Sequence, residues 1–332
     1  MCSALSERLA NTLPSVKSSS LSPATIPVPP LIRDAGHAAS LRFIEFFTAQ
    51  IRNKGTRQQY GKAVKQFFGW CDAQGIAFEQ IEPVVIAAYI ELLTQHLSSP
   101  TVKVHLAAIR RLYDYLVTGQ IVPFNPAAAV RGPTHIVKKG KTPVLTAEEA
   151  RELLDSISLY SVAGYRDRAL IAVMVYSFAR VSATLGMNVE DCFQQGRRMW
   201  FRLHEKGGKH HDVPAHHNAE SYVDDYLQVA GIAGQKQMPV FRTIGADKRL
   251  TENRMHRTDA LRMIKRRAIA IGLPDTICCH TFRATGITAY LQKGGSLEHA
   301  MQIACHESAR TTKLYDRTSD DVSLDEIERI RI

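Results

Sequence analysis

A histidine and a tyrosine nine residues apart mark the C-terminal part of the sequence. These are His306 and Tyr315, and the tetrapeptide H-T-F-R, from His280 to Arg283, precedes them. On a helix, His280 and Arg283 are three positions apart and project from the same face. Two donors on one face could hold a phosphodiester against the downstream phenol, which could attack it as a nucleophile. Each residue alone is more often structural, so this chemistry needs further partners.

Two other basic residues lie in segments that could bring them to the same site. Arg180 interrupts an apolar run over residues 165–187. Burying an unpaired arginine is costly, so Arg180 must reach solvent or bind an anion. Lys206 falls between two short extended runs, 199–203 and 211–213, next to a Gly-Gly pair. This pattern predicts a β-hairpin with the lysine at its tip, from which the side chain could swing into a site.

The chain is long enough for two domains and carries an excess of positive charge. It has 332 residues, 45% of them hydrophobic, with 42 Lys and Arg against 32 Asp and Glu, a net charge of +10. Its length exceeds that of a typical single core. The charge favours a polyanionic partner, although it does not separate DNA from RNA or an anionic membrane. No apolar run reaches the roughly 20 residues of a spanning helix. The N-terminus lacks a signal-peptide core as well, so we expect a cytoplasmic protein with no membrane partner.

Neither the cysteines nor the histidines indicate a metal site. The six cysteines include no C-x-x-C pair, which argues against a zinc ribbon or a disulfide framework. Five histidines crowd around the predicted hairpin: His204, His210, His211, His216 and His217. No matching set of acids or cysteines accompanies them, so we predict no metal and no other cofactor.

The N-terminal part of the chain divides into a tail and a helical domain. Residues 1–36 are rich in serine and proline and hold too little apolar surface to offset the entropy of ordering, which predicts a disordered tail. Residues 37–122 show helical periodicity throughout and predict four helices. The last of these carries one apolar stripe at steps of three and four: Val102, Leu106, Ile109, Leu112 and Leu116.

A linker and a second domain follow. Residues 123–145 are basic, contain proline and glycine without periodicity, and predict an extended linker. The second domain, 146–332, opens with the capping-box spacing of Thr146 and Glu149. Beyond the hairpin, we expect a helix near residues 219–230 and a longer one over residues 251–271.

Together these features resemble the tyrosine recombinases, the phage-integrase-like family. The resemblance covers roughly residues 38–332, and its motifs A-R-V-S, K-G-G-K and H-T-F-R occur in the family's order. The matching residues are Arg180, Lys206, His280, Arg283, His306 and Tyr315. Six matches in the correct order are far more specific than any one of them. The chain departs from the family at Ala183, where an acidic residue is usual, and at Cys305, where glycine is frequent.

The resemblance implies a mainly α-helical protein with a small β-hairpin or sheet. A helical core-binding (SAM-like) bundle and a C-terminal catalytic domain would form a clamp around double-stranded DNA. Tyr315 would be the nucleophile, with His280 taking its proton. The arginines and His306 would bind the phosphate, and Lys206 would protonate the leaving 5′ oxygen. The product would be a 3′-phosphotyrosyl ester, formed without metal or ATP.

Three questions stay open from the sequence alone. Seven basic residues are candidates for DNA contact, although a solvated charged face explains such residues as well: Arg57, Lys62, Lys103, Arg110, Arg257, Arg262 and Arg266. The apolar residues of 321–332 predict a helix that would dock on a neighbouring subunit, as in a synaptic tetramer, or pack on its own domain. A type IB topoisomerase-like enzyme and a non-catalytic DNA-binding regulator are the alternatives to a site-specific recombinase.

Overall fold

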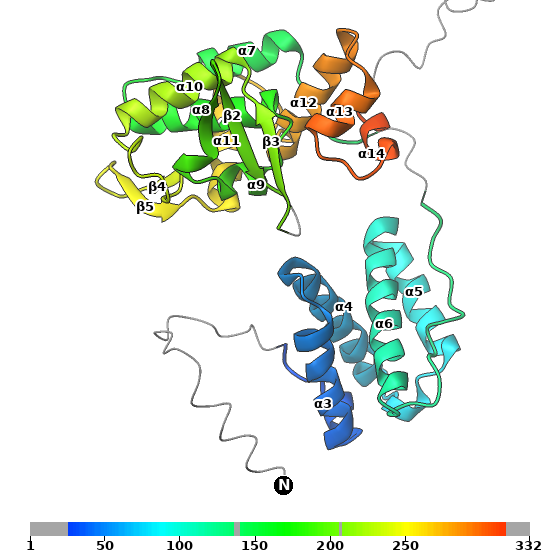
Figure 1. Ribbon diagram of the computed structural model, residues 1–332. Helices are drawn as coiled ribbons and strands as arrows, with labels where there is room; N and C mark the ends of the chain where they lie inside the picture. Colours follow the sequence, from blue (N-terminus) through cyan, green and yellow to red (C-terminus); the bar gives the residue numbers. More distant parts are fainter. Residues whose placement is uncertain (1–25, 136–139, 206–207, 317–332) are drawn as a thin grey trace, which may run out of the picture. The chain divides into compact units, whose positions relative to one another are not determined.

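A computed structural model describes residues 26–135, 140–205 and 208–316 of the chain. The chain divides into two compact units, Met1–Ile136 and Val137–Ile332. Each unit has its own hydrophobic core. Figure 1 shows the helices of the first unit in blue to cyan and the mixed second unit in green to orange. Among the described residues, no helix is both long and apolar enough to cross a membrane.

In the described part of the first unit, the regular elements are helices. They are α2 (Pro30–Asp34), α3 (His37–Glu45), the π-helical turn η1 (Phe46–Gln50), α4 (Lys54–Ala73), the 3-10 turn η2 (Phe78–Gln80), α5 (Pro83–His96) and α6 (Ser99–Thr118). The side chain of Asn53 caps α4 by accepting from the backbone N–H of Thr56 at 3.0 Å. Prolines stand in the first turns of α5 and α6, where a missing N–H costs nothing. The apolar stripe predicted for the last helix is buried along the whole of α6.

Parts of the predicted tail and of the predicted linker are packed in the core of this unit. The prediction of a disordered tail was wrong for its last residues, because Leu31 and Ile32 of α2 bury their side chains in the core. The first 25 residues of that tail lie outside the described part. Of the predicted linker, Ala127 and Val130 are buried in the same core. Apolar residues placed between prolines supplied the burial that composition alone did not indicate.

The second unit combines helices with two small sheets. Its elements are α7 (Ala147–Asp155), α8 (Val162–Tyr176), α9 (Val181–Gly186), η3 (Val189–Asp191), β1 (Cys192–Gln195), β2 (Arg198–His204), β3 (His210–Pro214), α10 (His217–Val229), β4 (Arg242–Ile244), β5 (Leu250–Arg254), α11 (Arg257–Ala270), α12 (Cys279–Gln292), α13 (Leu297–Ile303) and α14 (Ala309–Lys313). The predicted capping box is present at α7, where Thr146 accepts from Glu149 N at 3.1 Å and Glu149 accepts from Thr146 N at 2.8 Å.

Strands β1, β2 and β3 form an antiparallel sheet in that order. The predicted hairpin is confirmed as β2–β3, in which Phe201 faces Val213 and Leu203 faces His211. Along β2, Met199, Phe201 and Leu203 alternate toward the core. The tip, residues 206–207, lies outside the described residues.

The second sheet corrects the helix predicted over residues 251–271. Residues 250–254 form β5, which pairs antiparallel with β4, and the helix begins only at Arg257. Arg254 explains the difference, because its guanidinium donates to the main-chain oxygens of Leu185 and Met187. These partners are distant in sequence and override the local helical preference.

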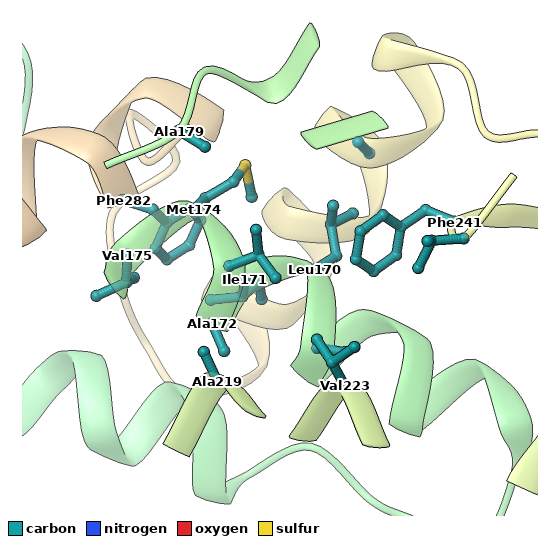
Figure 2. Packing of buried hydrophobic residues seen from close by; sticks show 14 of the residues in the cluster. Leu170, Ile171, Ala172, Met174, Val175, Ala179, Ala219, Val223, Phe241 and Phe282 are labelled. Atoms are coloured by element: carbon teal, nitrogen blue, oxygen red, sulfur yellow. The ribbon is translucent and has the colours of Figure 1, made fainter. Parts of the chain in front are cut away.

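Helix α8 is the central element of the second unit. It packs against α7, α9, α10 and α12, and most of its residues are buried, which is why its sequence shows an apolar run rather than a stripe. Figure 2 shows its side chains among those of the neighbouring elements: Leu170, Ile171 and Met174 from α8, Val223 from α10, Phe241, and Phe282 from α12.

A buried ionic network joins α8 to α11. Asp167 is 0% exposed and accepts from Arg166 at 2.7 and 3.1 Å, and from Arg267 at 2.8 and 3.2 Å. Its carboxylate is thus paired with two arginines inside the unit. Loss of one partner from such a buried pair costs far more than loss of a surface pair. Asp167 therefore fixes α11 on α8.

Candidate active site

Tyr315 lies directly after α14 and is fixed by its own backbone. Its carbonyl accepts from the hydroxyl of Thr288 at 2.9 Å, and its N–H donates to the carbonyl of Thr312 at 2.9 Å. The residue is 9% exposed and packs in a small apolar cluster with Phe178, Ile287 and other residues. The phenol of Tyr315 is thus held in one place by its backbone hydrogen bonds, including the one from Thr288 of α12, and by the packing of its ring.

The hydroxyl of Tyr315 lies 2.7 Å from Nε2 of His280, in the first turn of α12. His280 is exposed at the mouth of the site, yet the protein atoms around its ring remove enough water to lower its pKa. The positive charges of Arg283 and Arg180 lower that pKa further. A neutral imidazole is the form favoured, so Nε2 can accept the phenolic proton.

Arg283 lies beneath this pair and is 1% exposed. Its guanidinium donates to two main-chain oxygens, through Nη1 to Phe178 and through Nη2 to Ala304, the latter at 2.6 Å. Burial and the charge of Arg180 lower its pKa to about 10, so it stays protonated at neutral pH. Its buried Nε–H has no hydrogen-bond partner among the described residues. The site therefore holds a cation whose two hydrogen-bond partners are neutral carbonyls.

Two local backbone features make this arrangement possible. Phe178, whose carbonyl receives Arg283, has a φ of 53°, in the left-handed region that side chains other than glycine rarely adopt. Gly286 of α12 lies so close to α8 that a Cβ there would clash with the carbonyl of Val175 and the ring of Phe178. The strained turn after α8 and the close approach of α12 thus aim the Phe178 carbonyl at the arginine.

Arg180 occupies the N-cap position of α9, and its side chain points to the end of β2. Its side chain is 37% exposed, and Nη1 donates to Oε2 of Glu205 at 2.5 Å. The Glu205 side chain is 4% exposed and stands at the end of β2. The charge of Arg180 lowers the pKa values of His280, Arg283 and His306, which places its guanidinium within electrostatic range of all three.

His306 is 8% exposed, and its ring stacks on Tyr315 with centroids 5.7 Å apart. Its Nδ1 lies 2.8 Å from the hydroxyl of Thr312. Burial, followed by the charges of Arg283 and Arg180, lowers its pKa to about 3. The ring is therefore neutral at physiological pH. If Thr312 donates to Nδ1, then Nε2 carries the proton and can donate to an anion.

Cys305 shows what the position before this histidine requires. Its φ is 47°, a conformation that glycine adopts without strain and a cysteine only at a cost. The positive φ explains why glycine would be easier than cysteine at this position. The strained residue turns the chain from α13 into the segment that carries His306.

Lys206 lies outside the described residues, but the two strands that carry it are placed. Glu205 N donates to Lys209 O at 2.8 Å and closes the base of the hairpin tip. Nε2 of His211 lies 3.2 Å from Ile303 O, which brings β3 to the end of α13. The hairpin is thus anchored beside the segment that contains His306.

The basic residues predicted for DNA contact differ in how free they are. Lys62 and Lys103 are exposed on α4 and α6. By contrast, Arg57 donates twice to Ile51 O, at 2.8 and 3.1 Å, and Arg110 donates to the carbonyls of Ala127 and Val130, at 3.2 and 2.6 Å. These two arginines already tie loops to the first unit, a role that the sequence did not indicate.

The basic residues of α11 are more exposed. Arg257 is exposed in its first turn. Arg262 forms an exposed ion pair with Asp259 at 3.3 Å, and Arg266 lies 3.8 Å from the buried Asp167. An exposed pair such as Arg262–Asp259 contributes little to stability, so the Arg262 side chain can change partners.

Four of the five histidines around the hairpin contact one another in pairs, His204 with His210 and His216 with His217. His211 contacts Ile303 O, and His216 caps α10 and stacks on Tyr176 with ring centroids 4.2 Å apart. Within the described ranges, no three His, Cys, Asp or Glu residues are grouped so that they could hold a metal ion.

Sequence reasoning missed three residues that shape the site: Glu205, Thr288 and Thr312. The side chain of each is hydrogen-bonded to a motif residue, and none has a spacing that would distinguish it from an ordinary polar residue. The only indication in the sequence that one of these residues lies near the site was that Glu205 directly precedes Lys206.

Two family models match the chain. The phage integrase family matches residues 143–321, and the phage integrase N-terminal SAM-like domain matches residues 42–120. Among curated proteins, a tyrosine recombinase XerC from Thermodesulfovibrio yellowstonii is 26% identical over 268 residues, 78% of this chain and 84% of its own. A tyrosine recombinase XerC from Chlamydia trachomatis is 30% identical over 233 residues, 69% of this chain and 70% of its own.

Solved structures share the fold. The XerH site-specific recombinase bound to palindromic difH substrate, in a post-cleavage complex, has a TM-score of 0.68 at 18% identity, over 85% of this chain and 82% of its own. A lambda integrase tetramer bound to a Holliday junction has a TM-score of 0.62 at 16% identity, over 84% and 77%. The mainly helical architecture, with a SAM-like first domain, is therefore confirmed. The chain belongs to the phage integrase family and is a tyrosine-type site-specific recombinase.

Proposed function

We propose that this recombinase cuts and rejoins double-stranded DNA through a covalent 3′-phosphotyrosyl bond at Tyr315. The observation that carries this proposal is the 2.7 Å hydrogen bond between the Tyr315 hydroxyl and Nε2 of His280, beside Arg180 and Arg283. Relatives named recombinases, and a neighbour whose structure is a post-cleavage DNA complex, support it. They favour recombination over a topoisomerase-like enzyme or a non-catalytic regulator.

The first chemical requirement is a deprotonated nucleophile. An unperturbed phenol has a pKa of about 10, so only about one in a thousand is ionised at pH 7, a handicap of roughly 4 kcal/mol. His280 removes this handicap by accepting the proton as the phenolic oxygen approaches phosphorus. Its lowered pKa keeps the imidazole neutral and available in the free enzyme.

The second requirement is positive charge around the phosphate. Attack by the phenolic oxygen adds negative charge to the two non-bridging oxygens. Arg180 and Arg283 can donate charge-assisted hydrogen bonds to these oxygens, and Nε2 of the neutral His306 ring can add a further donor. Charged donors held in a site that excludes water stabilise such a transition state without Mg²⁺.

The third requirement is a proton for the leaving group. When the bond between phosphorus and the 5′ oxygen breaks, that oxygen takes up one proton, for which we propose Lys206 as the donor. The phosphotyrosyl ester keeps the energy of the broken phosphodiester, so attack by another 5′ hydroxyl restores DNA without ATP. The net reaction exchanges one phosphodiester for another.

We further propose that both units grip the duplex as a clamp, with Lys62 and Lys103 on phosphates and the basic residues of α11 near a groove. Lambda integrase is seen as a tetramer on a Holliday junction. By analogy, we propose a synaptic tetramer in which the 321–332 segment, outside the described residues, docks on a neighbouring subunit. Because the proposed substrate is DNA, we also propose that the protein acts in the cytoplasm.

Replacement of Tyr315 by phenylalanine tests the central step. Tyr315→Phe should bind DNA but form no covalent adduct on a nicked suicide substrate, as measured by denaturing gel electrophoresis. The matched control is Tyr160→Phe, at a fully exposed tyrosine before α8, which should form adducts at the normal rate. Adducts that persist in Tyr315→Phe would refute the assignment, and Tyr290 and Tyr165 would then be the next candidates.

A further inference from the structure

Arg180 has a carboxylate partner that comes from a different part of the chain. The guanidinium Nη1 donates to Oε2 of Glu205 at 2.5 Å, a short charge-assisted bond. Three residues after Arg180, on α9, stands the buried Ala183, whose methyl group offers no charge. The partner is instead supplied by β2, 25 positions later in the sequence.

Glu205 is itself firmly held. Its side chain is 4% exposed, and its backbone N–H donates to Lys209 O at 2.8 Å, at the end of the β2–β3 ladder. A carboxylate fixed by a sheet is a rigid anchor for a long side chain, which otherwise samples many rotamers. The bond uses one of the five N–H groups of Arg180, and the others remain for an anion.

The charge of Glu205 also matters for the second arginine. Arg180 lowers the pKa of Arg283 by repulsion, and Glu205 raises it again. Two arginines near each other repel, so an unneutralised pair would favour rotation of the more exposed one, Arg180, toward solvent. One carboxylate reduces that repulsion and leaves a net positive charge for the phosphate.

We propose that Glu205 is the positioning residue for Arg180, holding its guanidinium in the orientation that binds the scissile phosphate. This inference rests on the proposed function, because it assigns a role within the same cleavage reaction. Glu205 thus supplies the carboxylate that Ala183 lacks. Glu205 does not contact the reacting atoms but acts on them through Arg180.

The test compares Glu205→Gln, which keeps the shape and removes the charge, with Glu205→Asp, which keeps the charge. Glu152→Gln, at an exposed glutamate of α7, is the matched control. Each full-length variant is titrated against a nicked suicide substrate, giving the maximal rate of adduct formation, the final amplitude and the half-saturating DNA concentration.

Glu205→Gln should lower the maximal rate roughly 10- to 100-fold, since a misplacement of about 1 Å in a catalytic group can cost that much. The amplitude and half-saturating concentration should stay close to those of the parent, Glu205→Asp should recover part of the rate, and Glu152→Gln should match the parent. A Glu205→Gln rate equal to that of the parent would overturn the inference. So would a loss in amplitude or affinity that Glu205→Asp shares, because it would indicate misfolding. A parent protein without adducts would instead refute the proposed function.

Discussion

His306 makes the stability of the second unit sensitive to mild acid. The folded protein keeps this ring neutral, with a pKa of about 3, because it is buried near Arg283 and Arg180. In the unfolded chain, histidine has its ordinary pKa of about 6.5. Below pH 6.5 the unfolded state therefore binds a proton that the folded state does not. Stability falls as the pH decreases from 6.5 toward 3, and the loss from this residue then levels off.

The size of the effect at pH 5 follows from these two values. The unfolded residue is almost fully protonated there, about 1.5 pH units below its ordinary pKa, while folded His306 remains neutral. At about 1.4 kcal/mol for each pH unit, His306 should remove about 2 kcal/mol from the free energy of unfolding between pH 7 and pH 5. That is a large share of the 5–15 kcal/mol that a domain typically has.

The two tryptophans allow this to be measured on the second unit within the full chain. Trp70 lies in α4 of the first unit and Trp200 in β2 of the second, so a Trp70→Phe background leaves Trp200 as the fluorescent probe. Guanidinium unfolding is followed at pH 7 and pH 5, with and without His306→Asn. The loss on acidification should be about 2 kcal/mol smaller in His306→Asn.

The control is His299→Asn, at an exposed position of α13, which should lose as much stability on acidification as the parent. If His306→Asn loses as much as the parent too, then His306 is not held neutral in the folded state. Burial and the two arginines would then not lower the pKa of this ring, and its role as a neutral donor would be wrong.

Three other predictions concern the reaction and its assembly. Thr312→Val should slow adduct formation about tenfold, because it removes the hydroxyl that sets the His306 tautomer. Thr312→Ser keeps a hydroxyl and should restore the rate of adduct formation. Equal rates in the parent, Thr312→Val and Thr312→Ser would contradict that role. Lys103→Ala should weaken binding equally on all DNA sequences and flatten its salt dependence, whereas Arg110→Ala should mainly lower the melting temperature of the first unit, because Arg110 holds the Ala127 and Val130 carbonyls. Truncation after Arg317 should spare single-site binding and eliminate two-site complexes on native gels; a truncated protein that still joins two sites would show that the tail packs on its own subunit.

The motif residues could be found from the sequence because each has a fixed chemical type at a fixed spacing. His280 and Arg283 lie on one helical turn, and Tyr315 follows His306 by nine residues. Each of these two pairs can therefore be recognised from sequence spacing without tertiary information. The hairpin was equally accessible, since the alternation of Met199, Phe201 and Leu203 is a local signal. Strong local periodicity also gave the four long helices of the first unit.

Other features depend on contacts between distant residues and could not be predicted. The strand β5 has a helix-compatible sequence and forms because Arg254 reaches carbonyls nearly 70 positions away. The pair of Arg180 and Glu205 is likewise invisible in sequence, because the spacing between a helix cap and a strand end is set by the fold. The same holds for Arg110, whose charge suggested DNA and whose contacts are with its own chain.

Two buried arginines of the second unit, Arg166 and Arg283, have different kinds of hydrogen-bond partner. Arg166 and Arg267 share the carboxylate of Asp167, which cancels part of their charge, and the network ties α8 to α11. Arg283 is 1% exposed, more deeply buried than either, and it donates to two backbone carbonyls, which satisfy N–H groups without cancelling charge. A buried charge that no carboxylate cancels is costly. The strained turn at Phe178 and the close approach at Gly286 add to this cost. These features make sense together if the missing negative charge is delivered by the substrate, which is what a phosphodiester would do.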